Sequence, residues 1–287
     1  MVIKDLLVEG VDLLKQNSNI NPLFEAQVIL SKLLNVDKSF LIAHEDLEVK
    51  KTIEDEYFKI IKNRKEGYPL QYLLGEVEFY GYKFKVREGV LIPRPDTEIL
   101  VSFIIEYINQ KKLTNYRLLE IGVGSGAIIL SIAKSCPKGS LVGVDISETA
   151  LDVAKENKKN LGISNVELIK SDLFEAFHSS TNDTTENFDI IVSNPPYIDR
   201  EEMLNLQREV KYEPQIALFG GDDGLFYYKA ISDEARYHLK NGGILAFEIG
   251  LKQGEKVKEI LLNFGYRDIS ILKDFEQRDR VVVAYKD

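Results

Sequence analysis

The sequence of 287 residues predicts an α/β fold in which a helical bundle precedes a mainly parallel β-sheet. Three observations lead to this prediction. The first 66 residues carry apolar side chains at helical spacing, the period changes to two after residue 76, and strand-like segments then alternate with helical ones. A hydrophobic content of 44% is enough to fill the cores of one large and one small domain.

Amphipathic helices are expected at the N-terminus, because apolar residues recur there at three- and four-residue spacing in three stretches. Asn21 followed by Pro22 is typical of a helix start, where the asparagine caps and the proline occupies the first turn. The apolar positions are Leu6, Leu7, Leu13 and Leu14 in the first stretch, Phe24, Val28, Leu30, Leu33 and Leu34 in the second, and Ile53, Tyr57, Ile60 and Ile61 in the third.

A β-hairpin is expected next, because Val77–Phe79 and Tyr82–Val86 show strand patterning on either side of the turn Tyr80-Gly81. We therefore divide the chain into a helical domain over residues 1–75, a hairpin linker over 76–95, and a third domain over 96–287.

From residue 96 onward, helical patterns alternate with short strands, which is typical of a Rossmann-like sheet with helices on both faces. The last two strands should form an antiparallel hairpin at the edge of the sheet. The polar run from His178 to Asn187 is expected to be a mobile surface loop. The predicted strands are Arg117–Ile121, Ser140–Asp145, Val166–Lys170, Phe188–Ser193, Ile244–Ile249, Tyr266–Lys273 and Arg280–Tyr285.

Composition narrows the classes of function. A formal charge of −9 opposes the attraction by which nucleic-acid-binding proteins neutralise phosphates, so no nucleic-acid partner is expected. No segment approaches the roughly 18 apolar residues of a membrane helix, and the N-terminus lacks the pattern of a signal peptide, so we expect a cytoplasmic protein. We also expect the protein to be a monomer. The single cysteine, Cys136, is interpreted as helix-end packing. Because His44, His178 and His238 are scattered in the sequence, no metal is expected.

A glycine-rich turn follows the first strand of the sheet, in the order Glu120-Ile121-Gly122-Val123-Gly124-Ser125-Gly126. Glycine suits this turn because the chain must bend sharply, often through positive φ, and must let a ligand approach the backbone. The second strand ends at Asp145, whose carboxylate can accept hydrogen bonds from both hydroxyls of a ribose. A glycine turn and an acid about 20 residues apart predict a nucleoside site.

The spacing of the glycines bears on which nucleoside cofactor binds. Dinucleotide sites use G-x-G-x-x-G, whereas this turn reads G-x-G-x-G with an acid two residues before the first glycine, which favours S-adenosylmethionine. Glu120 can face the amino group of that ligand, and no pyrophosphate has to be held at the helix start. From the turn alone, a dehydrogenase and a purely structural turn remain alternatives.

Asp172 and Leu173 follow the third strand. Asp172 can accept a hydrogen bond from the amino group of adenine, and Leu173 can pack against the ring. The alternative is that Asp172 caps a helix that begins at Leu173.

The fourth strand runs directly into Asn194-Pro195-Pro196-Tyr197. An amide nitrogen is a poor nucleophile because its lone pair is delocalised, so methyl transfer to it depends on positioning. The Asn194 side chain and the Pro195 carbonyl can hold an NH2 group by both hydrogens and turn its lone pair toward the methyl group. The prolines stiffen this loop, and Tyr197 offers a flat face to a planar amide or base. A Pro-Pro turn with a capping asparagine is the alternative.

Further segments are more specific than this motif: Gln71-Tyr72-Leu73-Leu74-Gly75, Glu78-Phe79-Tyr80-Gly81 and Ile92-Pro93-Arg94-Pro95-Asp96-Thr97-Glu98, with Glu213-Pro214, Ala217-Leu218-Phe219 and Asp223-Gly224-Leu225. Together with the glycine turn and Asn194 to Tyr197, they resemble the bacterial peptide chain release factor N5-glutamine methyltransferases of the HemK/PrmC family. The resemblance covers essentially the whole chain.

This resemblance implies a class I methyltransferase fold that uses S-adenosyl-L-methionine and releases S-adenosyl-L-homocysteine. The implied acceptor is the glutamine in the Gly-Gly-Gln motif of class I release factors, which act in translation termination. Gly122 to Gly126, Asp145 and Asn194 would contact the cofactor, Asn194 to Tyr197 would hold the glutamine, and the N-terminal bundle would help to bind the release factor. Arg94 and Thr97 resemble gate or positioning residues; a solvated arginine and a helix cap are the alternative.

Three other functions stay open at this stage. A sister enzyme that methylates a glutamine of a ribosomal protein would use the same site. An adenine-N6 nucleic-acid methyltransferase would need a basic, aromatic-bearing groove, whereas Lys155, Lys158 and Lys159 lie beside acids and are interpreted as a solvated helix face. A non-catalytic adaptor that binds the cofactor only to fold is disfavoured by the intact Asn194–Tyr197 motif.

Overall fold

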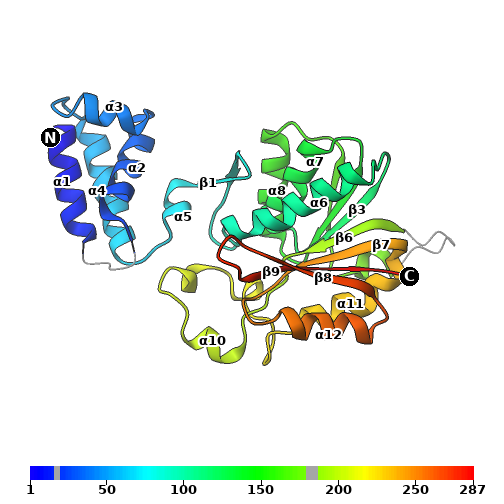
Figure 1. Cartoon of the computed structure of the whole chain (residues 1–287). Helices are drawn as coiled ribbons and strands as arrows, with labels where there is room; N and C mark the ends of the chain where they lie inside the picture. Colours follow the sequence, from blue (N-terminus) through cyan, green and yellow to red (C-terminus); the bar gives the residue numbers. More distant parts are fainter. Residues whose placement is uncertain (16–19, 179–186) are drawn as a thin grey trace. The chain divides into compact units, whose positions relative to one another are not determined.

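The computed structural model describes residues 1–15, 20–178 and 187–287, and the chain forms two compact units (Figure 1). The first unit comprises Met1–Glu76 and Gln207–Tyr212, and the second comprises Val77–Leu206 and Glu213–Asp287. The short segment Gln207–Tyr212, which lies within the range 96–287, thus belongs with the N-terminal helices. Among the described helices, none combines the length and the apolar composition needed to cross a membrane.

Helices build the first unit, as the apolar spacing predicts. Asn21 caps the second helix, because its Oδ1 accepts a hydrogen bond from the Phe24 amide at 3.1 Å, which confirms the predicted helix start. Leu6, Ile29 and Tyr57 are fully buried in the shared core. The helices are α1 (Ile3–Leu14), α2 (Pro22–Leu34), α3 (Lys38–Ala43), α4 (Lys51–Lys65) and α5 (Leu70–Leu74), of which α3 and α5 are short additions to the prediction.

A buried arginine joins the segment Gln207–Tyr212 to the helices of the first unit. The Arg64 side chain is only 4% exposed, and it donates to both carboxylate oxygens of Glu25, at 2.6 and 2.9 Å. Its third nitrogen forms an ion pair with Glu209 at 2.8 Å. The ring of Tyr212 packs edge-on against Tyr68, with centroids 5.1 Å apart. The segment is therefore held by charge at one position and by aromatic packing at another.

The predicted hairpin is formed by β1 (Glu76–Phe79) and β2 (Tyr82–Lys85). Tyr80 and Gly81 have φ values of 51° and 75°, and a two-residue turn with positive φ at both positions matches the twist of the flanking strands.

The second unit is built on a seven-stranded sheet with the order β5-β4-β3-β6-β7-β9-β8. Neighbouring strands from β5 through β7 run parallel, and β9 runs antiparallel to both β7 and β8, as predicted for the last strand. The strands are β3 (Arg117–Ile121), β4 (Ser140–Asp145), β5 (Val166–Lys170), β6 (Phe188–Ser193), β7 (Leu239–Glu248), β8 (Arg267–Lys273) and β9 (Asp279–Tyr285).

One strand of the second unit starts earlier than predicted, and one expected loop lies largely outside the described residues. Strand β7 begins at Leu239, five residues before the predicted start at Ile244, because Leu239 already pairs with Phe188 ahead of an irregularity in the register. The expected loop from His178 to Asn187 falls largely on residues 179–186, which are not among the described ones.

Alternate residues of each strand enter two separate cores. Leu118 belongs to the core on one face of the sheet and Leu119 to the core on the other. Helices α6, α7 and α8 cover the first face and helices α11 and α12 cover the second (Figure 1). The helices of the second unit are α6 (Glu98–Gln110), α7 (Ala127–Ser135), α8 (Glu148–Asn160), α9 (Glu175–His178), α10 (Arg200–Leu204), α11 (Phe226–His238) and α12 (Gly254–Asn263).

Candidate functional site

A cavity of about 340 Å³ lies in the second unit, where the carboxyl ends of the parallel strands meet. This volume is within the range of small-molecule sites. Segments that follow β3, β4, β5 and β6 all contribute to its wall, since parallel strands deliver their carboxyl ends to one edge of the sheet. The predicted site residues that line it are Glu120, Gly122, Val123, Gly124, Ser125, Asp145, Asp172, Leu173, Asn194, Pro195 and Pro196.

The glycine-rich turn needs glycine for its backbone conformation. Gly122 and Gly124 have φ values of 78° and 56°, and a Cβ at either position would meet no protein atom within 4 Å. The backbone is thus open to a ligand at both positions. Gly126 is not part of the cavity wall; a Cβ there would lie 2.8 Å from Leu130, so this glycine serves the packing of α7.

Glu120 has a structural task that its position in the motif does not reveal. Its Oε2 accepts a hydrogen bond from the Ile129 amide at 2.9 Å, in the first turn of α7. The N-cap residue of that helix, Gly126, has no side chain, so Glu120 satisfies an amide that would otherwise lack a partner. Burial raises the pKa of Glu120 well above its ordinary value, and the nearby Asp145 adds to this effect.

Asp145 organises the turn and also borders the cavity. Its Oδ2 accepts from the Gly124 amide at 2.8 Å, and its Oδ1 accepts from the Ser147 amide at 2.9 Å. Burial raises the pKa of Asp145, while these backbone hydrogen bonds act in the opposite direction. Each carboxylate oxygen keeps a further lone pair, so Asp145 can still accept two hydrogen bonds from a ligand.

The segment after β5 is capped by Ser171 rather than by Asp172. The Ser171 hydroxyl accepts a hydrogen bond from the Ala176 amide at 3.0 Å. Leu173, on the cavity wall, has φ of 45°, a left-handed conformation that costs a non-glycine residue about 1 kcal/mol. The Asp172 carboxylate accepts no hydrogen bond from the described residues and lies near Tyr227, which also lines the cavity.

The Asn-Pro-Pro-Tyr motif divides between the cavity and the core. Asn194 donates from Nδ2 to the Thr97 hydroxyl oxygen at 3.4 Å, and both residues line the cavity. Tyr197 does not line it. Its ring packs against the core under α11, and its carbonyl accepts from Gln253 at 2.9 Å. The predicted contact between the Tyr197 ring and a ligand is therefore absent from the described cavity; burial raises the pKa of this phenol well above its ordinary value.

Gly220 supports the motif by close backbone approach. A Cβ at this position would lie 2.7 Å from the Pro196 carbonyl oxygen and 2.7 Å from the Tyr197 Cα.

We expect Gly220→Ala to destabilise the protein by about 1–3 kcal/mol, because the rigid proline segment has to move. The free energy of unfolding in urea measures this effect. Gly81→Ala is the control, since its Cβ meets nothing within 4 Å and only the positive φ is penalised, by about 1 kcal/mol. Equal stability of Gly220→Ala and the wild type would contradict the argument.

Three charged residues near the motif form contacts that sequence reasoning missed. Glu213 is buried, accepts from the Ile92 amide at 3.0 Å, and pairs with Arg94, which lines the cavity and is thus not simply solvated. Glu248, the last residue of β7, is buried, and the side chains of Thr97 and Asn194 lie close to its carboxylate, where they act to lower its pKa. The sequence could have indicated Glu248 as a site residue, because it is a lone acid at the carboxyl end of an apolar strand.

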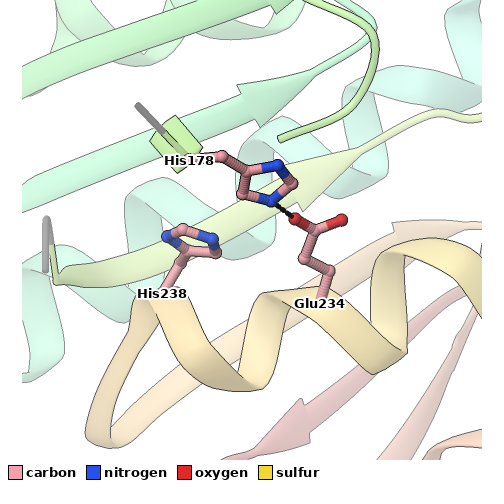
Figure 2. Close-up of side chains that lie close together, drawn as sticks. All are labelled: His178, Glu234 and His238. Carbon is pink, nitrogen blue, oxygen red and sulfur yellow. Dashed lines mark hydrogen bonds and ion pairs between the residues drawn. The ribbon is translucent and has the colours of Figure 1, made fainter. Parts of the chain in front are cut away.

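Two of the scattered histidines do come together, outside this cavity. Figure 2 shows His178 pointing toward Glu234, and His238 lies one helical turn from Glu234 on α11. Their potential ligand atoms lie within 4.8 Å of one another. His178 hydrogen-bonds to Glu234, and the His238 ring stacks on Phe174 with centroids 4.9 Å apart. These protein contacts account for the cluster. The distance between the two histidines in the sequence did not indicate that they lie close together in the fold.

Comparison with known protein families gives two matches to different parts of the chain. A family described as a methyltransferase domain matches residues 112–260, and the PrmC N-terminal domain matches residues 5–75. A release factor glutamine methyltransferase of Clostridium acetobutylicum is 41% identical over 289 residues, covering 100% of this chain and 99% of the relative. A protein of the same description from Fusobacterium nucleatum is 43% identical, covering 98% of this chain and 78% of the relative.

Solved structures agree on the fold. A methyltransferase from Pyrococcus furiosus has a TM-score of 0.50 at 20% identity, covering 71% of this chain and 88% of its own. A 16S rRNA N2 methyltransferase of T. thermophilus has a TM-score of 0.53 at 19% identity, covering 74% of this chain and 50% of its own. The second unit thus has the fold of class I methyltransferases.

Proposed function

The chain belongs to the family of release factor glutamine methyltransferases, and we propose that it methylates the N5 amide nitrogen of the glutamine in the Gly-Gly-Gln motif of a class I release factor. One observation carries the proposal. Asn194, Pro195 and Pro196 line the same cavity as the glycine-rich turn and Asp145. An amide held by the first group would lie beside a nucleoside held by the second.

The cavity has the donor and acceptor groups that S-adenosylmethionine requires. When bound, this cofactor supplies an electrophilic methyl group on a positively charged sulfur. The remaining lone pairs of Asp145 would accept from the ribose hydroxyls, and the Asp172 carboxylate would be available to the adenine amino group. Glu120 would face the cationic amino group, and such a cation would lower a carboxyl pKa that burial has raised.

Asn194 is suited to hold the acceptor amide. Its NH2 group is directed to Thr97, which leaves Oδ1 to accept from the NH2 group of the glutamine. The Pro195 carbonyl is the second acceptor. With both hydrogens so directed, the nitrogen lone pair is turned toward the methyl group. Tyr197 takes no part as a base, because its buried phenol stays neutral; the proton leaves to water once the methylated nitrogen has become acidic.

Transfer of labelled methyl from S-adenosylmethionine tests this function. The acceptors are purified release factor, its variant with alanine for the Gly-Gly-Gln glutamine, ribosomal proteins and DNA, assayed in parallel. We expect label on the release factor and none on the alanine variant. Label on ribosomal protein or DNA alone would support methyl transfer by this protein but would contradict release factor as its acceptor.

The first unit is proposed to bind the release factor, because an extended protein partner needs more contact surface than a cavity of this size offers. The match of residues 5–75 to the PrmC N-terminal domain supports a role specific to this family rather than to methyltransferases in general.

Arg64→Ala tests this role through the stability of the first unit. Removing Arg64 leaves Glu25 buried without its cation, which we expect to destabilise the unit by about 3–5 kcal/mol. Cofactor affinity should not change, because the residues lining the cavity all belong to the second unit. Chemical denaturation measures the stability, and the KM for release factor should rise.

Arg208→Ala is the matched control for this variant, because its ion pair with Glu66 joins two side chains that are 65% and 67% exposed. Such a pair contributes at most about 1 kcal/mol. An Arg64→Ala protein with a destabilised first unit and an unchanged KM for release factor would contradict the docking role.

A further inference from the structure

Glu248 lies next to the catalytic motif through the register of the sheet. Ser193 pairs with Phe247 in the parallel strands β6 and β7, so the following residues, Asn194 and Glu248, lie next to each other at this edge of the sheet. Glu248 is only 3% exposed and does not itself line the cavity. The side chains of Thr97 and Asn194 lie close to its carboxylate and act to lower its pKa, and both of these residues do line the cavity.

One carboxylate oxygen of Glu248 lacks a hydrogen-bond partner in the described part of the chain. Its Oε2 is buried and has no hydrogen-bond partner among the described residues. A buried acceptor without a partner destabilises a protein by about 1–3 kcal/mol. A structural role alone does not explain an acid at this position, since an apolar side chain would avoid this penalty.

We infer that Glu248 is a positioning residue that holds the Asn194 carboxamide in the orientation required by the acceptor glutamine. The inference rests on the proposed function. The Thr97 hydroxyl accepts from Asn194 Nδ2, and the Glu248 carboxylate close to both side chains attracts the same NH2 group, so the NH2 side of the amide is kept inside the protein. Oδ1 is then the only side-chain atom of Asn194 left for the substrate.

The charge of Glu248 matters in addition to its geometry. A neutral acceptor amide takes over positive charge from the sulfonium during methyl transfer, and a buried anion behind Asn194 stabilises that charge through the hydrogen-bonded amide. A protonated carboxyl is a weaker acceptor and offers a hydrogen of its own. The ionised form is therefore the one that orients Asn194.

The surroundings of Glu248 set the pH at which it ionises. Burial raises its pKa to about 7, hydrogen bonds from Thr97 and Asn194 and the charge of Arg280 act against burial, and Asp96 adds to it. Arg280 is itself shared between Asp96, at 2.9 Å, and Asp274, at 3.0 Å. The phenols that face Glu248 are Tyr197 and Tyr228, and both have pKa values raised by burial, so they stay neutral.

The first test compares the pH dependence of kcat for the wild type and Glu248→Gln with release factor as acceptor. In the wild type, kcat should fall about tenfold for each pH unit below 7, because the protonated carboxyl does not orient Asn194. Glu248→Gln should lower kcat at pH 8 by about 10- to 100-fold and remove the pH step. The KM for release factor and the cofactor Kd should stay within about threefold, since only orientation is lost.

Glu255→Gln is the matched control, because it makes the same change on α12 at a side chain that is 80% exposed. It should leave kcat and its pH dependence as in the wild type. A Glu248→Gln protein with kcat within twofold of the wild type at pH 8, or with a persisting step near pH 7, would overturn the inference.

Thermal unfolding provides a second test that needs no acceptor. A carboxyl whose folded-state pKa lies above its ordinary value of 4.5 stabilises the protein in its protonated form, and this contribution is lost as the pH rises toward 7. The wild type should therefore lose stability relative to E248Q between pH 5 and pH 8. A difference in melting temperature that does not change with pH overturns the inference. Absence of methyl transfer to release factor by the wild type would instead overturn the proposed function.

Discussion

Replacing Asn194 with alanine is expected to lower kcat for methyl transfer to release factor by about 10²- to 10³-fold. The alanine has no oxygen to accept from the glutamine NH2 group, so the lone pair of the acceptor nitrogen is no longer held in line with the methyl group. The cofactor Kd should change by less than about tenfold, because Asp145 and the glycine-rich turn are untouched. Single-turnover kinetics with labelled cofactor measure the rate of the chemical step.

Asn205→Ala is the control for this change, since Asn205 is an exposed asparagine at the end of α10 whose side chain donates to the carbonyl of Glu201, at 3.1 Å. It should retain wild-type turnover. An Asn194→Ala protein with near-normal kcat would remove Asn194 from the proposed mechanism, whereas a loss of cofactor binding would assign it to the nucleoside site instead.

Asp145→Ala is expected to raise the cofactor Kd by about 100-fold, which corresponds to about 2.7 kcal/mol. The variant loses the acceptors for both ribose hydroxyls, and it also frees the Gly124 and Ser147 amides that the carboxylate now binds. Affinity therefore falls through lost contacts and through a less ordered turn. Titration calorimetry with S-adenosylhomocysteine measures the Kd without turnover.

Two variants separate these causes. Asp145→Asn keeps one carbonyl oxygen and the shape of the side chain, so its affinity should lie between those of the wild type and the alanine variant. Asp152→Ala, in a side chain that is 63% exposed on α8, should leave the Kd unchanged. Unchanged affinity in Asp145→Ala would argue against ribose contact.

The sheet could be predicted from the sequence because its central strands are short apolar runs with clear ends. Arg117–Ile121, Ser140–Asp145, Val166–Lys170 and Phe188–Ser193 are strands with the predicted bounds. Parallel strands deliver their carboxyl ends to one edge, so the residues that follow them had to meet, and most of the predicted site residues do line one cavity.

The remaining features depend on contacts that no local pattern encodes. Glu120 caps a helix that begins after the turn, Ser171 rather than Asp172 caps the segment after β5, and Tyr197 packs against the core although its motif borders the cavity. Glu248 was missed because its partners Thr97 and Asn194 come from distant parts of the chain. Each of these assignments requires knowing which elements pack together, and local spacing carries no such information.

The return of Gln207–Tyr212 to the N-terminal helices has a consequence for synthesis on the ribosome. Residues Met1–Glu76 leave the exit tunnel first, but Arg64 cannot meet Glu209 until translation has passed Tyr212. The N-terminal helices therefore reach their final stability late, after most strands of the second unit have been made. The two units therefore emerge in overlapping order, because the first unit begins before the second and ends within it.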